Sequence, residues 1–170
     1  MVKVWDPLVR LGHWALVAGI AIAWFTREGA RTVHEQIGYA VLAIVVLRVL
    51  WGFTGPHYAR FAQFVCSPST TFAYARAVLA GSGSRHLGHN PLGGWMTVVL
   101  LGMIALVALS GWLYTTDTFW GVQWVAEVHE ALSDVLLGLI ALHIAGVVFT
   151  SYRHRENLVA AMVHGRKRPG

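Results

Sequence analysis

Four histidines that lie in or beside apolar stretches are the residues of this sequence best suited to chemistry: His13, His34, His129 and His143. Ionisable side chains at membrane depth are costly and usually mark function. His129 and His143 are 14 residues apart, which is nearly four helical turns. In one helix their rings would leave the same face, about 21 Å apart along the axis. They would then lie near the two boundaries of a hydrocarbon core about 30 Å thick.

Four apolar segments carry these histidines or connect them. They cover about residues 8–25, 36–54, 91–115 and 123–152, and each approaches the roughly 20 residues that cross a hydrocarbon core. Hydrophobic residues make up 56% of the 170 residues and charged residues only 12%, against about 25% charged residues in soluble domains. The sequence therefore predicts a single all-α domain over the whole chain, an integral membrane four-helix bundle with a long loop at 55–90.

Lysine and arginine are distributed very unequally over the connections between these segments. The connection between the first two segments holds only Arg27 and Arg31. The other side collects Lys3, Arg10, Arg48, Arg60, Arg76, Arg85, Arg153, Arg155, Arg166, Lys167 and Arg168. Because positively charged segments stay in the cytoplasm, we expect a multi-pass protein of the bacterial inner membrane with both termini and the long loop cytoplasmic. The bases do not form one basic domain, so we expect no nucleic acid partner.

This topology places the four histidines at two depths. His13 enters the first segment from the cytoplasm, at the level of His143, and His34 opens the second segment from outside, at the level of His129. Neutral imidazole is a good axial ligand for haem iron, and facing helices of a bundle can hold a planar macrocycle between them. We therefore predict two b-type haems per chain, one for each pair of histidines.

Other uses of these histidines explain the pattern less well. A zinc site needs three or four ligands at one level, whereas each level offers two. A proton relay gives no reason for the interval of 14 residues. The single cysteine, Cys66, excludes an internal disulfide and a cysteine-ligated iron–sulfur cluster. Without a C-x-x-C-H motif, the haems are expected to be bound non-covalently.

Two arginines repeat the same interval. Arg27 and Arg48 each follow a predicted ligand of the same segment by 14 residues, so each would face the depth of the other haem. Guanidinium compensates carboxylate charge well, and we expect Arg27 to serve the outer haem propionates and Arg48 the inner ones. Arg10 and Arg31, each three residues before a histidine, are further candidates. The alternative is that these side chains extend to lipid headgroups.

Several motifs along the chain resemble the bacterial cytochrome b561 family. They are WDPLVRLGHW at 5–14, TVHEQIG at 32–38, GHNPLG at 88–93, and VHE at 128–130 followed by His143. That family is similar to the cytochrome b subunits of nickel–iron hydrogenases and formate dehydrogenases. The resemblance covers nearly the whole chain. It implies the same pairing of the histidines, and it implies quinone chemistry near the cytoplasmic haem.

The resemblance also implies a role for His89 and Asn90, which precede the third apolar segment. In formate dehydrogenase cytochrome subunits, an Asn in the similar loop contacts the quinone headgroup. An amide can hydrogen-bond a quinone carbonyl, and an imidazole can assist proton transfer. The alternative, compatible with the first, is that Asn90 caps a helix that begins at Pro91.

The resulting hypothesis is transmembrane electron transfer between membrane quinone and a redox partner outside, by a quinone oxidoreductase or a simple electron carrier. A periplasmic c-type cytochrome would suit Asp117 and Glu127, whereas superoxide would suit Arg27 and Arg31, and these few charges do not choose between them. Two alternatives remain open: a small histidine-based proton or ion transporter, and a membrane subunit that docks a larger redox complex. An oligomer is possible, and the direction of electron flow is undefined.

The long loop and the tail have features of their own. Ser67 is expected to cap a short interfacial helix over 68–80, which the Gly-Ser run at 81–84 ends. The basic tail at 166–168 is typical of a segment attracted to anionic lipid. We expect the loop and tail histidines to be solvated: His57, His86, His154 and His164.

Overall fold

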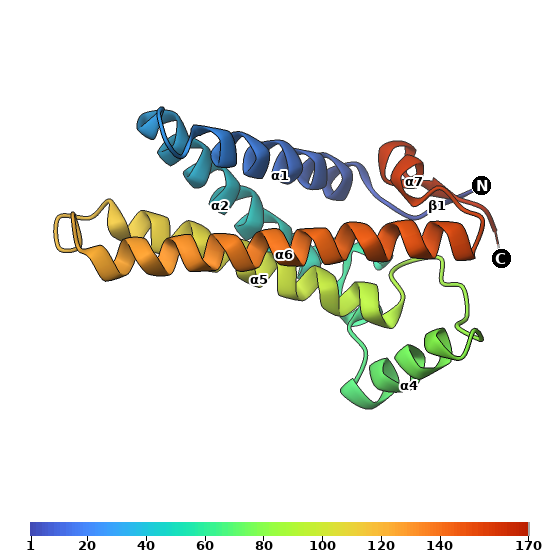
Figure 1. Cartoon of the computed structure of the whole chain (residues 1–170). Helices are drawn as coiled ribbons and strands as arrows, with labels where there is room; N and C mark the ends of the chain where they lie inside the picture. The colour runs from blue at the N-terminus through green and yellow to red at the C-terminus, as the bar shows by residue number, and fades with distance from the viewer. Residues whose placement is uncertain (170) are drawn as a thin grey trace. The chain divides into compact units, whose positions relative to one another are not determined.

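The computed structural model describes residues 1–169, and within that range the fold is helical apart from one short strand pair (Figure 1). The α-helices of the described chain are α1 (Pro7–Thr26), α2 (Arg31–Thr54), α3 (Phe61–Phe64), α4 (Pro68–Leu79), α5 (Pro91–Tyr114), α6 (Gln123–Arg153) and α7 (Leu158–His164). A 3-10 turn, η1, covers His57–Ala59, and the strands are β1 (Val2–Lys3) and β2 (Arg166–Lys167). The all-α prediction is confirmed.

Four of these helices, α1, α2, α5 and α6, are long and apolar enough to cross a membrane. In the most apolar stretch of each, between 6% and 17% of the residues are buried inside the chain. Large apolar side chains such as Leu47 and Ile144 are exposed instead. Apolar surface of this extent is unfavourable in water, whereas hydrocarbon solvates it. The four predicted spans are therefore present in number, length and composition.

The start of α2 differs from the sequence prediction. The ends of α1, α5 and α6 lie within one residue of those predicted, but α2 begins at Arg31 rather than at residue 36. Hydropathy marks the apolar part of a helix, and this first turn is polar. It is stabilised by an ion pair of 2.7 Å between Arg31 and Glu35, four residues apart. His34 is therefore the fourth residue of α2, in its first turn, and the predicted start of the helix at residue 36 was wrong.

The chain forms two compact units. The first, called the histidine unit below, comprises Leu11–Val49 and Leu100–Ala141. The second, called the terminal unit, comprises the rest of the described chain and so contains both ends and the long loop. These segments are the ones predicted to share the cytoplasmic side. The side of the membrane on which they lie stays a prediction.

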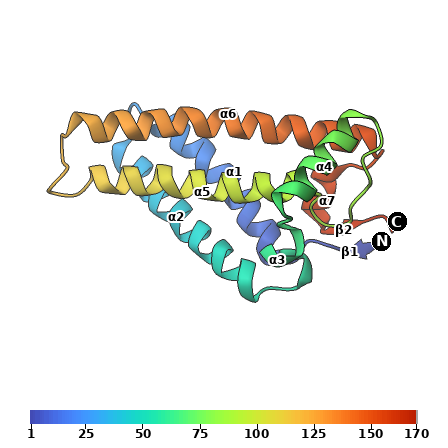
Figure 2. The ribbon, with the colours of Figure 1, turned by 90° about the horizontal axis from the view of Figure 1, so that it is seen from below.

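The core of the histidine unit is small and apolar. Val41 of α2, Ile104 of α5, and Val125 and Leu136 of α6 are buried. A Cβ on Gly19 would lie only 2.7 Å from Cγ2 of Val41, so this glycine allows α1 and α2 to approach closely. In both views the last turns of α5 and the first turns of α6 lie side by side (Figures 1 and 2). The unit thus packs parts of all four long helices around shared apolar side chains.

The terminal unit ties the two ends of the chain together. β1 pairs with β2 in antiparallel fashion, with Val2 opposite Lys167, and Figure 2 shows both strands next to the termini. The carbonyl of Gly165 accepts the N–H groups of the two residues that follow β1, at 2.9 and 3.1 Å. The Arg10 guanidinium donates to the carbonyl of Val163 in α7. This arrangement occupies one of the arginines that were candidates for propionate binding.

The long loop contains the predicted short helix. α4 covers Pro68–Leu79, and the Ser67 hydroxyl caps it by accepting the N–H of Thr70 at 3.2 Å. The helix ends at Leu79 with Ala80 as its C-cap, and Gly81 follows with a φ of +79°. That conformation is strained for other residues, which explains the stop. The predictions of the helix, its cap and its end are confirmed.

The basic tail is anchored within the protein at one residue, and its attraction to anionic lipid stays a prediction. Residues 166–167 form β2, and Lys167 is only 5% exposed, with its Nζ 3.9 Å from Glu156. Glu156 also accepts a hydrogen bond of 2.9 Å from Arg85. Burial raises the pKa of Glu156, but the Arg85 hydrogen bond and the charges of Lys167 and Arg85 outweigh it and hold the pKa below its ordinary value. A buried charge needs such partners, so Lys167 anchors the tail within the protein.

The four loop and tail histidines divide into two groups. His57 and His164 are exposed, as expected. His86 and His154 are half-buried, and the ring of His86 packs edge-on against Tyr74 with centroids 5.3 Å apart. The prediction that all four are solvated was therefore wrong for this second pair, because the tail folds back over the loop.

Candidate functional site

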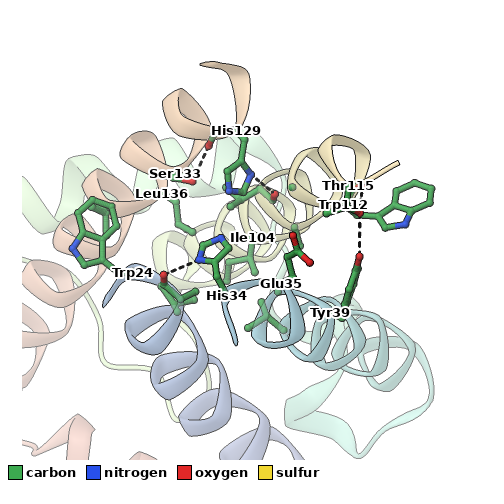
Figure 3. Close-up of a pocket in the computed structure, with 18 residues that line it drawn as sticks. Trp24, His34, Glu35, Tyr39, Ile104, Trp112, Thr115, His129, Ser133 and Leu136 are labelled. Carbon is green, nitrogen blue, oxygen red and sulfur yellow. Dashed lines mark hydrogen bonds between the residues drawn. The ribbon is translucent and has the colours of Figure 1, made fainter. Parts of the chain in front are cut away.

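Two of the predicted ligands meet inside the histidine unit. His34 projects from α2 and His129 from α6, and their rings face each other across a cavity (Figure 3). The ring centroids are 6.1 Å apart, and the ring planes are nearly perpendicular, at 84°. The predicted pairing of these histidines at one depth is therefore consistent with the geometry of the unit.

A backbone carbonyl fixes the tautomer of each ring. Nδ1 of His34 lies 2.9 Å from the carbonyl oxygen of Ala23 in α1. Nδ1 of His129 lies 3.0 Å from the carbonyl oxygen of Val107 in α5. A carbonyl can only accept, so both Nδ1 atoms carry the proton of the neutral ring. Each Nε2 then keeps a free lone pair, which is the form of imidazole that binds a metal.

Two further residues of α5 lie against the His129 ring. The Ser110 hydroxyl lies 3.1 Å from Nδ1 of His129 and donates to the Val107 carbonyl at 2.9 Å. A Cβ on Gly111 would lie 2.9 Å from Cε1 of the ring, so only glycine lets the ring approach the helix this closely. The sequence analysis missed both residues, because a serine followed by a glycine in an apolar helix carries no signal of its own.

The cavity between the rings has a volume of about 110 Å³, below the range of about 300–1,000 Å³ typical of ligand pockets. Its lining is mainly apolar, and Gly38 borders it with no atom within 4 Å of the position a Cβ would take. At its edge Tyr39 and Thr115 share a hydrogen bond of 3.1 Å.

The donor set fits a metal held by two imidazoles. Among residues 1–169, no three histidine, cysteine or carboxylate side chains are close enough to hold an ion together, so a closed zinc-type site is absent from the described chain. Two metal–imidazole bonds of about 2 Å, with about 1 Å from each nitrogen to its ring centre, would place two ring centres about 6 Å apart. The observed 6.1 Å would therefore suit two imidazoles that hold one metal, such as a haem iron, which would supply one-electron chemistry.

Two of the candidate arginines already have partners within the histidine unit. Arg27 lies one residue beyond the end of α1. Helical periodicity from His13 therefore does not determine the direction of its side chain. Its guanidinium pairs with Glu28 at 3.3 Å and lies over the ring of Trp24. Arg31 pairs with Glu35 and lies 4.0 Å above the ring of Trp120. Each of the two guanidinium groups is therefore already paired with a carboxylate and an aromatic ring.

The remaining predicted residues within the spans are His13, His143 and Arg48. His13 lies in α1 in the histidine unit, and His143 lies in α6 in the terminal unit. Arg48 lies in α2, and all three are half-buried. His129 and His143 share one unbroken helix, as their interval requires. The pairing of His13 with His143 stays a prediction from that interval.

The proposed quinone residues lie together in the terminal unit. Asn90 caps α5, with its Oδ1 accepting the N–H of Gly93 at 2.7 Å, so the capping alternative is confirmed. The His89 ring packs against Trp5 and Phe64, with centroids 4.7 and 4.5 Å apart. The capping bond uses the amide oxygen of Asn90, and the role of its NH₂ group toward a quinone stays a prediction.

Four apolar helices whose facing histidines present free Nε2 atoms to one cavity are typical of a membrane cytochrome of the b type. Comparison with protein-family models agrees: the chain belongs to the prokaryotic cytochrome b561 family, whose model matches residues 4–165. Members of this family bind haem b and carry out transmembrane electron transfer. Searches of curated proteins and of solved structures found no match to the chain.

Proposed function

We propose that this chain transfers electrons across the bacterial inner membrane through two non-covalently bound b haems. His34 and His129 would hold the outer haem, and the single observation that carries this assignment is the pair of rings 6.1 Å apart with both Nδ1 protons directed at carbonyls. His13 and His143 would hold the inner haem, an assignment supported by the 14-residue interval between His129 and His143. Haem held in this way would supply one-electron transfer, and the two imidazoles would leave no position for oxygen.

The experiment is a haem count combined with ligand substitutions. Purified protein should contain two haems per chain in a pyridine haemochrome assay, extractable by acid acetone. His34→Ala and His129→Ala should remove the same spectral component, and His13→Ala and His143→Ala the other. His57→Ala, in the exposed η1 turn, is the control that keeps both. One haem per chain overturns the scheme, and a colourless protein favours a histidine-based transporter or a docking subunit.

The inner redox substrate in this proposal is membrane quinone, and its headgroup would lie near His89 and Asn90. The half-buried imidazole of His89 lies beside two aromatic rings, and the amide oxygen of Asn90 accepts the Gly93 N–H at 2.7 Å. These contacts support the proposal. The Asn90 oxygen holds the helix, so its NH₂ group would donate to a quinone carbonyl. The His89 ring would exchange the proton that quinone reduction or quinol oxidation requires.

We infer that the outer partner is a positively charged electron carrier such as a c-type cytochrome. Glu28 and Glu35 neutralise the two outer arginines, whereas Asp117 and Glu127 are exposed. Complementary charge increases the rate of encounter, and salt screens it. Reduction or oxidation by a basic cytochrome should therefore slow with ionic strength. A faster reaction with superoxide than with cytochrome would identify superoxide as the outer substrate instead.

Arg48 is proposed as a charge partner for the inner haem propionates, since it lies half-buried within a continuous helix. The structure weakens the corresponding assignment of Arg27 and Arg31 to the outer haem, because neighbouring carboxylates hold both guanidinium groups. Arg10 holds α7 through the carbonyl of Val163. Substituting Arg48 should therefore lower one haem potential, with a smaller effect from the outer arginines.

A further inference from the structure

We propose that Ser110 is a positioning residue that, together with the Val107 carbonyl, fixes the ring plane of His129 when that ring serves as an axial ligand. The inference rests on the proposed function of the His34–His129 pair. Ser110 would not contact the cofactor. Its effect would pass through the nitrogen of His129 that faces away from the metal.

Three groups of one turn of α5 restrain this ring. The Nδ1 proton lies between two acceptors, the Val107 carbonyl at 3.0 Å and the Ser110 hydroxyl at 3.1 Å. The hydroxyl donates its own proton to the same carbonyl at 2.9 Å, so its lone pairs remain directed at the ring. Gly111 supports the ring edge, since a Cβ there would meet Cε1 at 2.9 Å.

A single acceptor would restrain the ring less. An imidazole can rotate about its Cβ–Cγ bond over a wide arc while it keeps one hydrogen bond of acceptable geometry, since terminal torsions to flat groups have broad minima. Two acceptors on the same proton narrow that arc, because the N–H must point between them. Outer hydrogen-bond partners of this kind orient metal-bound imidazoles in general. Ser110 supplies the second acceptor.

The orientation of the ring has an observable consequence. The planes of His34 and His129 lie at 84° to each other. Axial imidazoles interact with the two iron dπ orbitals according to the direction of their planes. Perpendicular planes leave these orbitals nearly equal in energy and give a highly anisotropic ferric low-spin EPR signal, whereas parallel planes give a more rhombic one. A ring free to rotate would therefore lower and broaden the largest g value.

The experiment compares three variants of the haem-loaded protein by EPR. Ser110→Ala removes the hydroxyl beside Nδ1. Ser133→Ala is the matched control, because that hydroxyl borders the same cavity but donates to the backbone carbonyl of His129 at 2.7 Å. Ser110→Thr keeps a hydroxyl at the position and should restore the wild-type signal. Haem content is measured in each sample.

We expect the largest g value of one haem to fall and broaden in Ser110→Ala alone, with the other haem unchanged. Loss of that haem from Ser110→Ala, with retention in Ser133→Ala and Ser110→Thr, also supports positioning. An unchanged signal in Ser110→Ala, or an equal shift in Ser133→Ala, overturns the inference. If His129→Ala keeps the same EPR line, the proposed ligand pair itself is wrong, which distinguishes the two failures.

Discussion

The histidine unit and the terminal unit satisfy their buried polar groups in different ways. In the histidine unit, neutral backbone carbonyls hold the N–H groups of His34 and His129. In the terminal unit, a buried carboxylate, Glu156, binds Arg85 and lies near Lys167. Dipoles fix a tautomer without adding charge, whereas ion pairs anchor chain ends strongly but respond to pH. We therefore expect that the two histidine rings and the anchoring of the chain ends can be disturbed separately.

The largest effect is expected from Gly111→Ala in the histidine unit. The new Cβ would lie 2.9 Å from the His129 ring, so the ring must leave the Val107 carbonyl. Overpacking of tight contacts costs about 1–3 kcal/mol, and we expect haem affinity at this site to fall about tenfold. The control is Gly102→Ala in the same helix, where no atom lies within 4 Å of the new Cβ. Haem titration of both variants checks this, and equal affinities would contradict it.

Glu156→Gln should affect the terminal unit and leave the haem spectra unchanged. The substitution leaves Arg85 and the 5% exposed Lys167 without their carboxylate, and breaking a buried pair costs roughly 3 kcal/mol. Faster hydrogen exchange in β1 and β2 would report the loss. Glu28→Gln is the matched control, because its side chain is 83% exposed and such pairs contribute little. Altered haem spectra in Glu156→Gln would show that the units are not separable.

Asn90→Asp tests the quinone role without removing the helix cap. Aspartate keeps an oxygen for the Gly93 N–H but cannot donate to a quinone carbonyl. Loss of one such hydrogen bond, worth roughly 1 kcal/mol, should slow electron exchange with quinone about fivefold in stopped-flow measurements. Asn157→Asp is the control, since Asn157 caps α7 in the same manner, at 2.8 Å from the Ala160 N–H. An unchanged rate would leave Asn90 with its capping role alone.

The smallest effect is a pH dependence confined to the terminal unit. Burial, together with the charges of His154 and Lys167, holds the pKa of His86 below its ordinary value of 6.5. The unfolded state therefore binds the proton first as the pH falls below that value, and the unit loses stability on acidification. The protection factors of the β1 amides, which correct for the pH dependence of intrinsic exchange, should be modestly lower at pH 5.5 than at pH 7.5. His86→Gln should reduce this difference, whereas His57→Gln in η1 should not.

The sequence predicted the features that depend on local periodicity. Helical geometry predicted the ends of α5 and α6 and the placing of His129 and His143 on one helix. Short-range capping predicted the role of Ser67. The sequence did not predict the early start of α2, because Arg31 and Glu35 make the first turn too polar to be recognised as part of an apolar span. Ser110 and the burial of Lys167 depend on contacts between distant segments, which one sequence does not display.

The pairing of β1 with β2 also has a consequence for biosynthesis. Val2 and Lys167 are far apart in the sequence, so β1 is made before the four spans and has no partner until the residues after α7 are made. Contacts this far apart in sequence form late, because the intervening chain must be ordered first. Closure of the strand pair would thus report that all four spans have been synthesised. A chain interrupted before Gly165 would insert its spans but leave β1 open to proteolysis.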